Sequence, residues 1–334
     1  MFHQLNLVMA QSRKSLICLE NTPYYHCVTR CVRKSFLCGF DRKTGQNYEY
    51  RKAWIEKRIH FLAEVFSIKV CAYAVMSNHI HLVLYVDKNT VQSWSTKMVL
   101  CQWHKLHKGS ALTRKFLQNE KLSESELEMV EKTAELYRQR LFSISWFMRD
   151  LNEFIARKAN KEDDCTGRFW EGRFFSQALL DERAVIACMA YVDLNPIRAG
   201  IAQCLNTSQY TSIRRRIKLD SNGEKSVAFV PFSEQTETKL QFRLSFSFNN
   251  YCELLVNSIS VCNKAEHSHT LAVTGITSKV NKFGFKEYQW QALVKHFGTL
   301  FGVAIGSPQA LNKFKQLTAR KRIMGMGAAK LLFR

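Results

Sequence analysis

The chain has 334 residues, 46% of them hydrophobic, and its 49 basic and 28 acidic side chains give a formal net charge of +21. No apolar run approaches the length of a membrane span and no signal-peptide layout opens the chain, so we exclude an integral membrane protein and expect a soluble, cytoplasmic one. A positive charge of this size indicates a polyanionic partner, most often nucleic acid, and the alternative is a basic surface that binds nothing.

The N-terminal part of the chain predicts a strand, a helix and two further strands. Residues 22–33 (TPYYHCVTRCVR) are rich in aromatic and β-branched residues and predict a strand. Apolar residues at helical spacing predict a helix over residues 47–66. Residues 68–75 and 79–86 predict two strands joined by the short polar turn Ser77-Asn78.

Helical patterns then dominate until one more strand. Residues 91–108 and 144–158 predict helices, and between them residues 109–143 form a charged, solvated helical insertion. A strand is predicted at residues 174–179 and a helix at residues 184–194. The element order is the β-α-β-β-α-β pattern of a ferredoxin-like antiparallel sheet, so we expect an α+β fold.

The composition changes in the C-terminal third. Residues 216–248 are polar with mixed charge and predict a linker, whereas residues 249–334 look mostly helical. From Lys279 to the end there are 11 basic side chains and one acidic side chain, which concentrates +10 of the net charge there. We therefore expect an N-terminal tail (1–19), an α+β domain (20–215), the linker and a basic helical C-terminal region.

The eleven cysteines are unevenly spaced, and no pair has the C-x-x-C spacing. We expect reduced thiols in a reducing compartment. A zinc knuckle built on the tightest cluster, Cys27, Cys31 and Cys38, is the alternative.

A His-x-His pair opens the second strand of the predicted hairpin. His79 and His81 flank Ile80 at the start of an apolar run. Because side chains alternate along a strand, both imidazoles project from one face while Ile80 projects from the other. Two imidazoles about 6–7 Å apart along a strand face can converge on one divalent ion. Histidines that only satisfy hydrogen bonds are the alternative.

A tyrosine on the last helix of the α+β part gives this pair a context. Tyr191 lies on an apolar helix face, where a tyrosine taken alone is usually core. Asn195 follows four residues later, so the two side chains share a face, and its amide oxygen is able to complete a three-ligand set with two imidazoles. Such a set suits Mg²⁺ or Mn²⁺ acting on a phosphate better than structural zinc. Pro196 is expected to end or kink the helix at Asn195.

Four segments in this order resemble blocks of the single-tyrosine HUH transposases, most closely the REP-associated tyrosine transposases, relatives of the smallest bacterial insertion-sequence transposases. The segments are YYHCVTR from Tyr24, YAVMSNHIH from Tyr73, GRFWEGRF from Gly167 and YVDLNPIRAG from Tyr191. The resemblance covers roughly residues 20–215. The four blocks are specific together, whereas His-x-His alone is a weak signal. The chain departs from the family in its charged insertion and its basic C-terminal extension.

The resemblance implies an HUH endonuclease fold and a role for each matching residue. His79 and His81 are implied to be metal ligands, Asn195 matches the position of the third ligand, and Tyr191 is the implied nucleophile. The implied activity is cleavage and rejoining of single-stranded, hairpin-bearing DNA through a 5′-phosphotyrosine, with Mg²⁺ or Mn²⁺ as cofactor. The resemblance also implies a bacterial, nucleoid-associated location and allows a homodimer.

Basic and aromatic side chains supply candidate DNA contacts. Residues 168–174 mix arginines with aromatics, and the alternative is a core aromatic cluster with surface arginines. The runs 214–216 and 320–322 are expected to grip the backbone of a folded hairpin, or else to be solvated. His104 and His107 are expected to be surface helix residues rather than ligands. The candidates are His26, Arg30, Arg168, Trp170, Arg173, Arg214, Arg215, Arg216, Arg320, Lys321 and Arg322.

Two other functions fit the same residues. A relaxase or rolling-circle nickase shares the site, although such proteins often carry a second tyrosine or a helicase-like domain, neither of which is evident here. A domesticated hairpin-binding protein without mobility is the non-enzymatic alternative. The intact set of His79, His81, Tyr191 and Asn195 favours catalysis.

Overall fold

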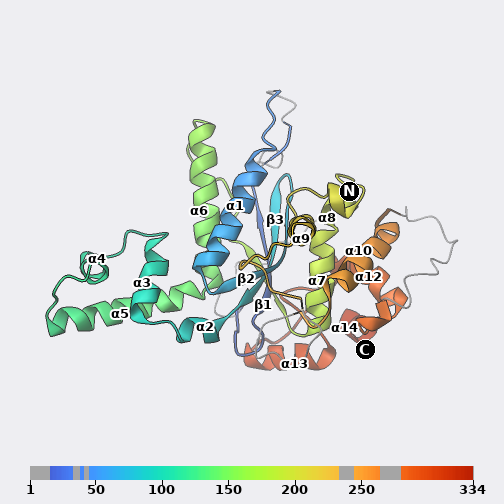
Figure 1. The fold of residues 1–334 in the computed structure, drawn as a ribbon. Coiled ribbons are helices and arrows are strands. Elements are labelled where there is room, and N and C mark those ends of the chain that lie inside the picture. Colours follow the sequence, from blue (N-terminus) through green and yellow to red (C-terminus); the bar gives the residue numbers. More distant parts are fainter. Residues whose placement is uncertain (1–15, 33–37, 41–44, 233–243, 264–279, 334) are drawn as a thin grey trace.

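The computed structural model describes residues 16–32, 38–40, 45–232, 244–263 and 280–333. Most of the predicted N-terminal tail and parts of the predicted linker and C-terminal region lie outside these residues. Helices cover both faces of one five-stranded sheet (Figure 1), so the fold is α+β, as the sequence predicts. Among the described residues, no helix is both long enough and apolar enough to cross a membrane.

The sheet has the strand order β2-β3-β1-β4-β5. The first four strands are antiparallel to their neighbours, whereas β5 runs parallel to β4. Their bounds are Tyr24–Arg30 (β1), Ile68–Val75 (β2), His79–Val86 (β3), Phe175–Leu179 (β4) and Ala304–Ile305 (β5). The bounds predicted for β2 and β3 are confirmed, and both strands are almost wholly buried, as their apolar runs require.

Two long helices cover one face of the sheet. They are α1 (Arg51–Val65) and α6 (Ile144–Glu162), which lie beside each other in Figure 1. Most of the apolar stripe of α1 that the sequence predicts is buried, and Trp54 is half-buried. Arg51 is also buried, and its guanidinium is 2.7 Å from the carboxylate of Glu162. This ion pair joins the start of α1 to the end of α6.

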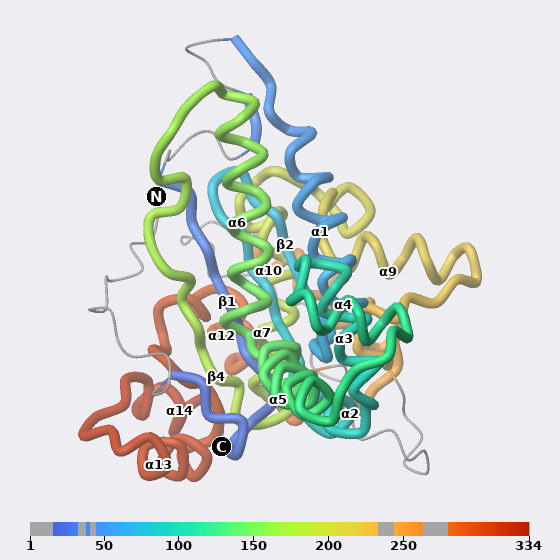
Figure 2. The backbone as a smooth tube through the Cα atoms, turned by 90° about the vertical axis from the view of Figure 1, so that its left-hand side faces the viewer, coloured from blue at the N-terminus to red at the C-terminus, as the bar shows by residue number. Residues whose placement is uncertain are grey.

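A group of helices projects from the sheet as an arm (Figure 1), and in Figure 2 this arm faces the viewer. It contains α2 (Lys88–Gln92), α3 (Thr96–His104), α4 (Ala111–Leu117) and α5 (Glu124–Leu141). The single helix predicted over residues 91–108 is therefore wrong. Ser95 has an extended backbone and accepts a hydrogen bond from the amide of Met98, which starts a new helix at that point.

The other face of the sheet is covered by helices from both the middle and the end of the chain. Helix α7 (Glu182–Asp193) contacts β2, β3 and β4, and α8 (Asn195–Arg198), α10 (Phe248–Asn263) and α12 (Glu287–Leu300) pack against α7 or against one another. Helix α9 (Ser212–Ser221) lies at the edge of the sheet formed by β2. The short 3-10 helix η2 (Leu205–Thr207) precedes α9, and α13 (Pro308–Leu317) and α14 (Met326–Leu332) complete the chain. Helix α12 packs against α7, and β5 follows it into the sheet.

Candidate functional site

The two predicted metal ligands share a sheet face with a third histidine. The ring centroids of His79 and His81 on β3 are 4.8 Å apart, while Ile80 is buried on the opposite face. On β1, His26 lies opposite Val83, so its side chain projects from the face of His79 and His81. The rings of His26 and His81 are stacked, with centroids 5.2 Å apart. The site thus contains three imidazoles, one more than the His-x-His motif supplies.

A row of hydrogen bonds fixes the orientation of His81. Gln177 on β4 donates its side-chain amide to the carbonyl oxygen of Gly302, 2.5 Å away, which turns its Oε1 toward His26. His26 therefore donates Nδ1–H to Gln177 Oε1 over 3.3 Å, and its Nε2 accepts from Nδ1–H of His81 over 2.9 Å. The remaining nitrogen of His81, Nε2, carries a lone pair, the form in which imidazole binds a metal.

His79 is oriented by its own neighbour. Its Nδ1 is 2.6 Å from Oδ1 of Asn78, and because an amide oxygen only accepts, the ring carries its proton on Nδ1. Burial, and then the charge of Arg30, lowers the pKa of His79 to about 4. Burial also lowers the pKa of His81 well below its usual value, and the nearby imidazoles add to this effect. Both rings are neutral at pH 7, as metal ligation requires.

Tyr191 reaches this cluster from α7. Its ring centroid is 5.8 Å from that of His81 and 6.3 Å from that of His26. On the other side the ring stacks on Phe297 of α12, with centroids 5.0 Å apart. The guanidinium carbon of Arg198 lies 4.4 Å from the ring centroid. The sequence therefore brings the predicted tyrosine beside the predicted histidines, although the two motifs are about 110 residues apart.

Helix α12 contributes a residue that the sequence does not reveal. A Cβ atom added to Gly298 would lie 2.8 Å from the hydroxyl oxygen of Tyr191, closer than real Cβ contacts. Glycine at this position lets the helix lie against the tyrosine hydroxyl. Neither Phe297 nor Gly298 stands in a motif, so only the folded chain identifies them.

Asn195 occupies the start of α8, where the predicted break in the helix occurs. Helix α7 ends at Asp193, and Pro196 stands in the first turn of the next helix. The Asn195 side chain is half-buried. Within the described part of the chain, this side chain makes no hydrogen bond to His79 or Tyr191, and no group of three or more His, Cys, Asp or Glu side chains forms a metal site. Of the three predicted metal ligands, the structure thus brings together the imidazoles of His79 and His81.

The candidate contacts at residues 168–174 lie beside the end of β1. The amide of Glu171 donates to the carbonyl oxygen of Arg30 over 2.9 Å, which holds the segment there. Arg168 and Arg173 are exposed. Trp170 is only 8% exposed, and its indole N–H donates to the carbonyl oxygen of Asn152 over 2.8 Å. Trp170 is therefore packed into the protein, with little of its ring open to solvent.

The basic run at the start of α9 divides between surface and interior. Arg215 is exposed and Arg214 is half-buried. Arg216 is buried, and its guanidinium donates to the carbonyl oxygens of Cys71 and Val230 over 3.2 and 3.1 Å. These bonds join α9 to the edge of the sheet, so the placement of Arg216 favours a structural role.

The last basic run and two further histidines lie in other parts of the chain. Lys321 and Arg322 are exposed and Arg320 is half-buried in the turn between α13 and α14. His107 pairs with Asp150 over 3.2 Å, and His104 is hydrogen-bonded to Thr113 over 3.1 Å. The two latter histidines are half-buried and have partners in the arm and on α6.

Comparison with known proteins gives little support beyond this geometry. No protein-family model matches the chain, and neither does any curated protein. A solved structure, described as a REP-associated tyrosine transposase bound to a REP hairpin, aligns with 69% of this chain and 96% of its own, at 11% identity and a TM-score of 0.36. A similarity this low carries no argument about function, which must rest on the residues.

Proposed function

We propose that the protein is a metal-dependent transesterase that cleaves and rejoins hairpin-bearing single-stranded DNA through a 5′-phosphotyrosine, as a REP-associated tyrosine transposase. The observation that carries the proposal is the position of Tyr191, whose ring centroid lies 5.8 Å from that of His81, beside His79 on one sheet face. The positive charge of +21 supports a polyanionic substrate.

We also propose that the sheet is ferredoxin-like, as in HUH endonucleases. Support comes from the order β2-β3-β1-β4, in which every neighbouring pair is antiparallel. Strand β5 is then an addition to one edge. The predicted homodimer and nucleoid association stay predictions.

The residues present fit two ligands of the proposed metal. His79 and His81 are neutral, each has its Nδ1 engaged, and each is left with Nε2 as a donor. Asn195 is the proposed third ligand. A bound Mg²⁺ or Mn²⁺ would supply Lewis acidity toward the non-bridging oxygens of the scissile phosphate.

The protein's own part in the reaction falls to Tyr191. Its hydroxyl oxygen attacks phosphorus and loses its proton, the bond from phosphorus to the 3′ oxygen breaks, and the released oxygen takes up a proton. The product is a 5′-phosphotyrosine and a free 3′-hydroxyl. Attack of a 3′-hydroxyl on the phosphotyrosine restores the phosphodiester and the tyrosine without ATP. The stacked ring of Phe297 limits the rotation of the Tyr191 ring during both steps.

A second candidate function is hairpin binding without cleavage. The close approach of Gly298 to the Tyr191 hydroxyl favours it, because α12 takes up part of the space around that oxygen.

Cleavage of a labelled hairpin strand in Mn²⁺ tests the proposal and separates the two functions. We expect cleavage by the wild type, none by Tyr191→Phe, and normal cleavage by Tyr288→Phe, a control at an exposed tyrosine of α12. His79→Ala is expected to lower the rate at least 100-fold and to weaken its dependence on Mn²⁺. Undiminished cleavage by Tyr191→Phe would remove the nucleophile assignment, and tight binding with no cleavage by the wild type would favour the second function.

A further inference from the structure

We infer that the exposed side of α6 forms a second binding groove, one that holds single-stranded nucleic acid on the sheet face opposite Tyr191. The side-chain amide of Asn152 donates to Oγ1 of Thr29 over 3.3 Å, so α6 packs on the face from which Thr29 projects. His26 and Arg30 alternate with Thr29 and project toward Tyr191 instead. The inference concerns binding alone and does not depend on the cleavage chemistry.

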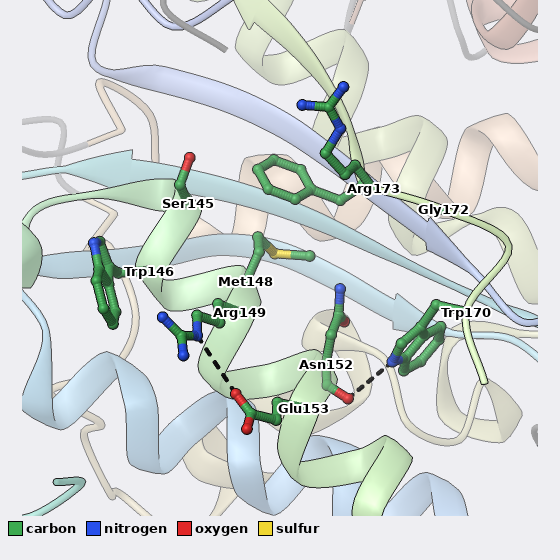
Figure 3. A pocket seen from close by; sticks show the side chains of 10 residues that line it. Ser145, Trp146, Met148, Arg149, Asn152, Glu153, Trp170, Gly172 and Arg173 are labelled. Atoms are coloured by element: carbon green, nitrogen blue, oxygen red, sulfur yellow. Dashed lines mark hydrogen bonds and ion pairs between the residues drawn. The ribbon is translucent and has the colours of Figure 1, made fainter. Parts of the chain in front are cut away.

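Two hollows run along α6 and meet at one ion pair. The first, of about 520 Å³, lies between α6 and the segment before β4, and includes Trp146 and Arg173 (Figure 3). The second, of about 700 Å³, lies between α6 and α1 and includes Phe154. Both are lined by Arg149 and Glu153. Together they form a track along most of the helix.

The carboxylates of the track already have partners, so they do not cancel the charge of its remaining cations. Glu153 is held between Arg149, at 3.4 Å, and Arg157, at 2.5 Å. Asp150 is only 5% exposed and faces His107.

Further cations along the track stay open to solvent. Lys158 and Lys161 are exposed on α6, and Arg173 is exposed across the first hollow. Arg157 is also exposed, although it pairs with Glu153. A row of exposed cations beside carboxylates that already have partners suits the negative charge of a phosphate backbone.

Aromatic rings alternate with these cations. Trp146 is half-buried, with the guanidinium carbons of Arg140 and Arg149 at 4.4 and 4.7 Å from its ring centroid. Phe154 is 38% exposed in the second hollow, with Arg58 at 4.5 Å. Partly exposed rings bordered by cations are an arrangement that stacks unpaired bases while holding phosphates, and duplex DNA has no base faces to offer them. This favours a single strand as the occupant.

Fluorescence anisotropy with a labelled 20-nucleotide oligothymidine tests the groove, using the full chain in EDTA so that cleavage does not interfere. We expect the double variant Arg157→Glu, Lys161→Glu to bind at least 10-fold more weakly. The slope of log affinity against log salt should also become shallower by about 1.4, from two lost phosphate contacts at about 0.7 each. The control is Lys121→Glu, Lys132→Glu, the same charge change at exposed lysines of the arm, with an expected change under 2-fold. An equal loss in both variants would overturn the inference.

A second pair of variants tests the aromatic rings of the groove. We expect Trp146→Ala to weaken binding about 5- to 100-fold and Trp146→Phe to retain most of it, because stacking needs a ring. A blunt duplex of the same length that binds the wild type as tightly as the single strand would refute the assignment to unpaired bases.

Ultraviolet crosslinking of the wild type to 5-iodouracil DNA keeps the test decisive if a variant misfolds. The expected crosslinked peptide contains Trp146 or Phe154, and crosslinks confined to other peptides would contradict the groove. A groove that binds while Tyr191 forms no adduct would refute only the proposed cleavage, and the reverse result only the groove.

Discussion

At the scale of the residue, His26 is the part of the site that acts through another side chain. It accepts the Nδ1–H of His81 over 2.9 Å and is itself held by Gln177. Such a partner fixes the tautomer and the ring angle of a metal ligand. His26 is therefore a positioning residue, whereas the sequence predicts it as a DNA contact; its side chain is buried and both ring nitrogens have partners.

Replacing His26 by phenylalanine tests this role. The variant keeps an aromatic ring in the stack but loses the acceptor, so His81 is no longer held in one tautomer. We expect the Mn²⁺ concentration at half-maximal cleavage to rise about 10- to 100-fold, with a smaller change in the rate at saturating Mn²⁺. The control His60→Phe replaces a half-buried histidine of α1, on the other face. A loss confined to the saturated rate, with the metal requirement unchanged, would contradict the positioning role.

At the scale of the element, α7 is held between α12 and the pair α9 and α10. The contact with α12 depends on Gly298, where an added Cβ would lie 2.8 Å from the Tyr191 hydroxyl. The contact with α9 and α10 depends on Asp193. This carboxylate accepts from Ser212 Oγ and the amide of Ile213, at 2.5 and 3.0 Å, and from the hydroxyl of Tyr251 at 2.8 Å.

Alanine at Gly298 is expected to destabilise the protein despite its better helix propensity. Alanine normally favours a helix over glycine by about 1 kcal/mol, but overpacking costs about 1–3 kcal/mol and wins where a ring must shift. The control is Gly327→Ala in α14, where no atom lies within 4 Å of an added Cβ. Thermal unfolding should show a lower Tm for the first variant and an equal or higher Tm for the second. A raised Tm for both variants would contradict the close contact between Gly298 and the Tyr191 hydroxyl.

Asp193 predicts a pH dependence of stability. Burial raises its pKa from 3.8 to about 6, although the three donors and Arg216 oppose the shift. A pKa raised by folding means that the folded state binds the proton more tightly, so this contribution is fully present below pH 4 and is lost as pH rises through 6. Relative to Asp193→Asn, the wild type should gain about 2 kcal/mol of unfolding free energy between pH 7 and pH 4. Urea unfolding at both pH values measures this, with Asp220→Asn, an exposed site, as control. A pH-independent difference would contradict the buried titration.

At the scale of the whole molecule, local patterns predict well and long-range contacts do not. The bounds of β2 and β3 follow from alternation and apolar runs, and the two imidazoles project together for the same reason. Strand β5 has two residues and thus no period to detect. The contact between the rings of Tyr191 and Phe297 joins residues about 100 positions apart, and no sequence motif predicts it. The predicted C-terminal region therefore completes the surroundings of the site.

The basic run at residues 214–216 shows why composition misleads within a helix. Successive residues of an α-helix point about 100° apart, so three in a row cannot all face solvent when one side of α9 packs on the sheet. Arg216 falls on the packed side, where its guanidinium finds two backbone carbonyls. Net charge predicts a polyanionic partner for the whole molecule. The position of each residue around the helix axis determines which cations can reach that partner.

The proposed function requires a covalent bond between Tyr191 and DNA, and mass spectrometry of the adduct detects that bond. The wild type would be incubated with Mn²⁺ and a hairpin-bearing single strand, quenched in detergent and digested with trypsin and a nuclease. We predict a nucleotide joined through a 5′ phosphate to the peptide that contains Tyr191, and its absence in EDTA. A 5′ phosphate on any other residue, or strand cleavage without a protein-bound nucleotide, would contradict the assignment of Tyr191 as the nucleophile.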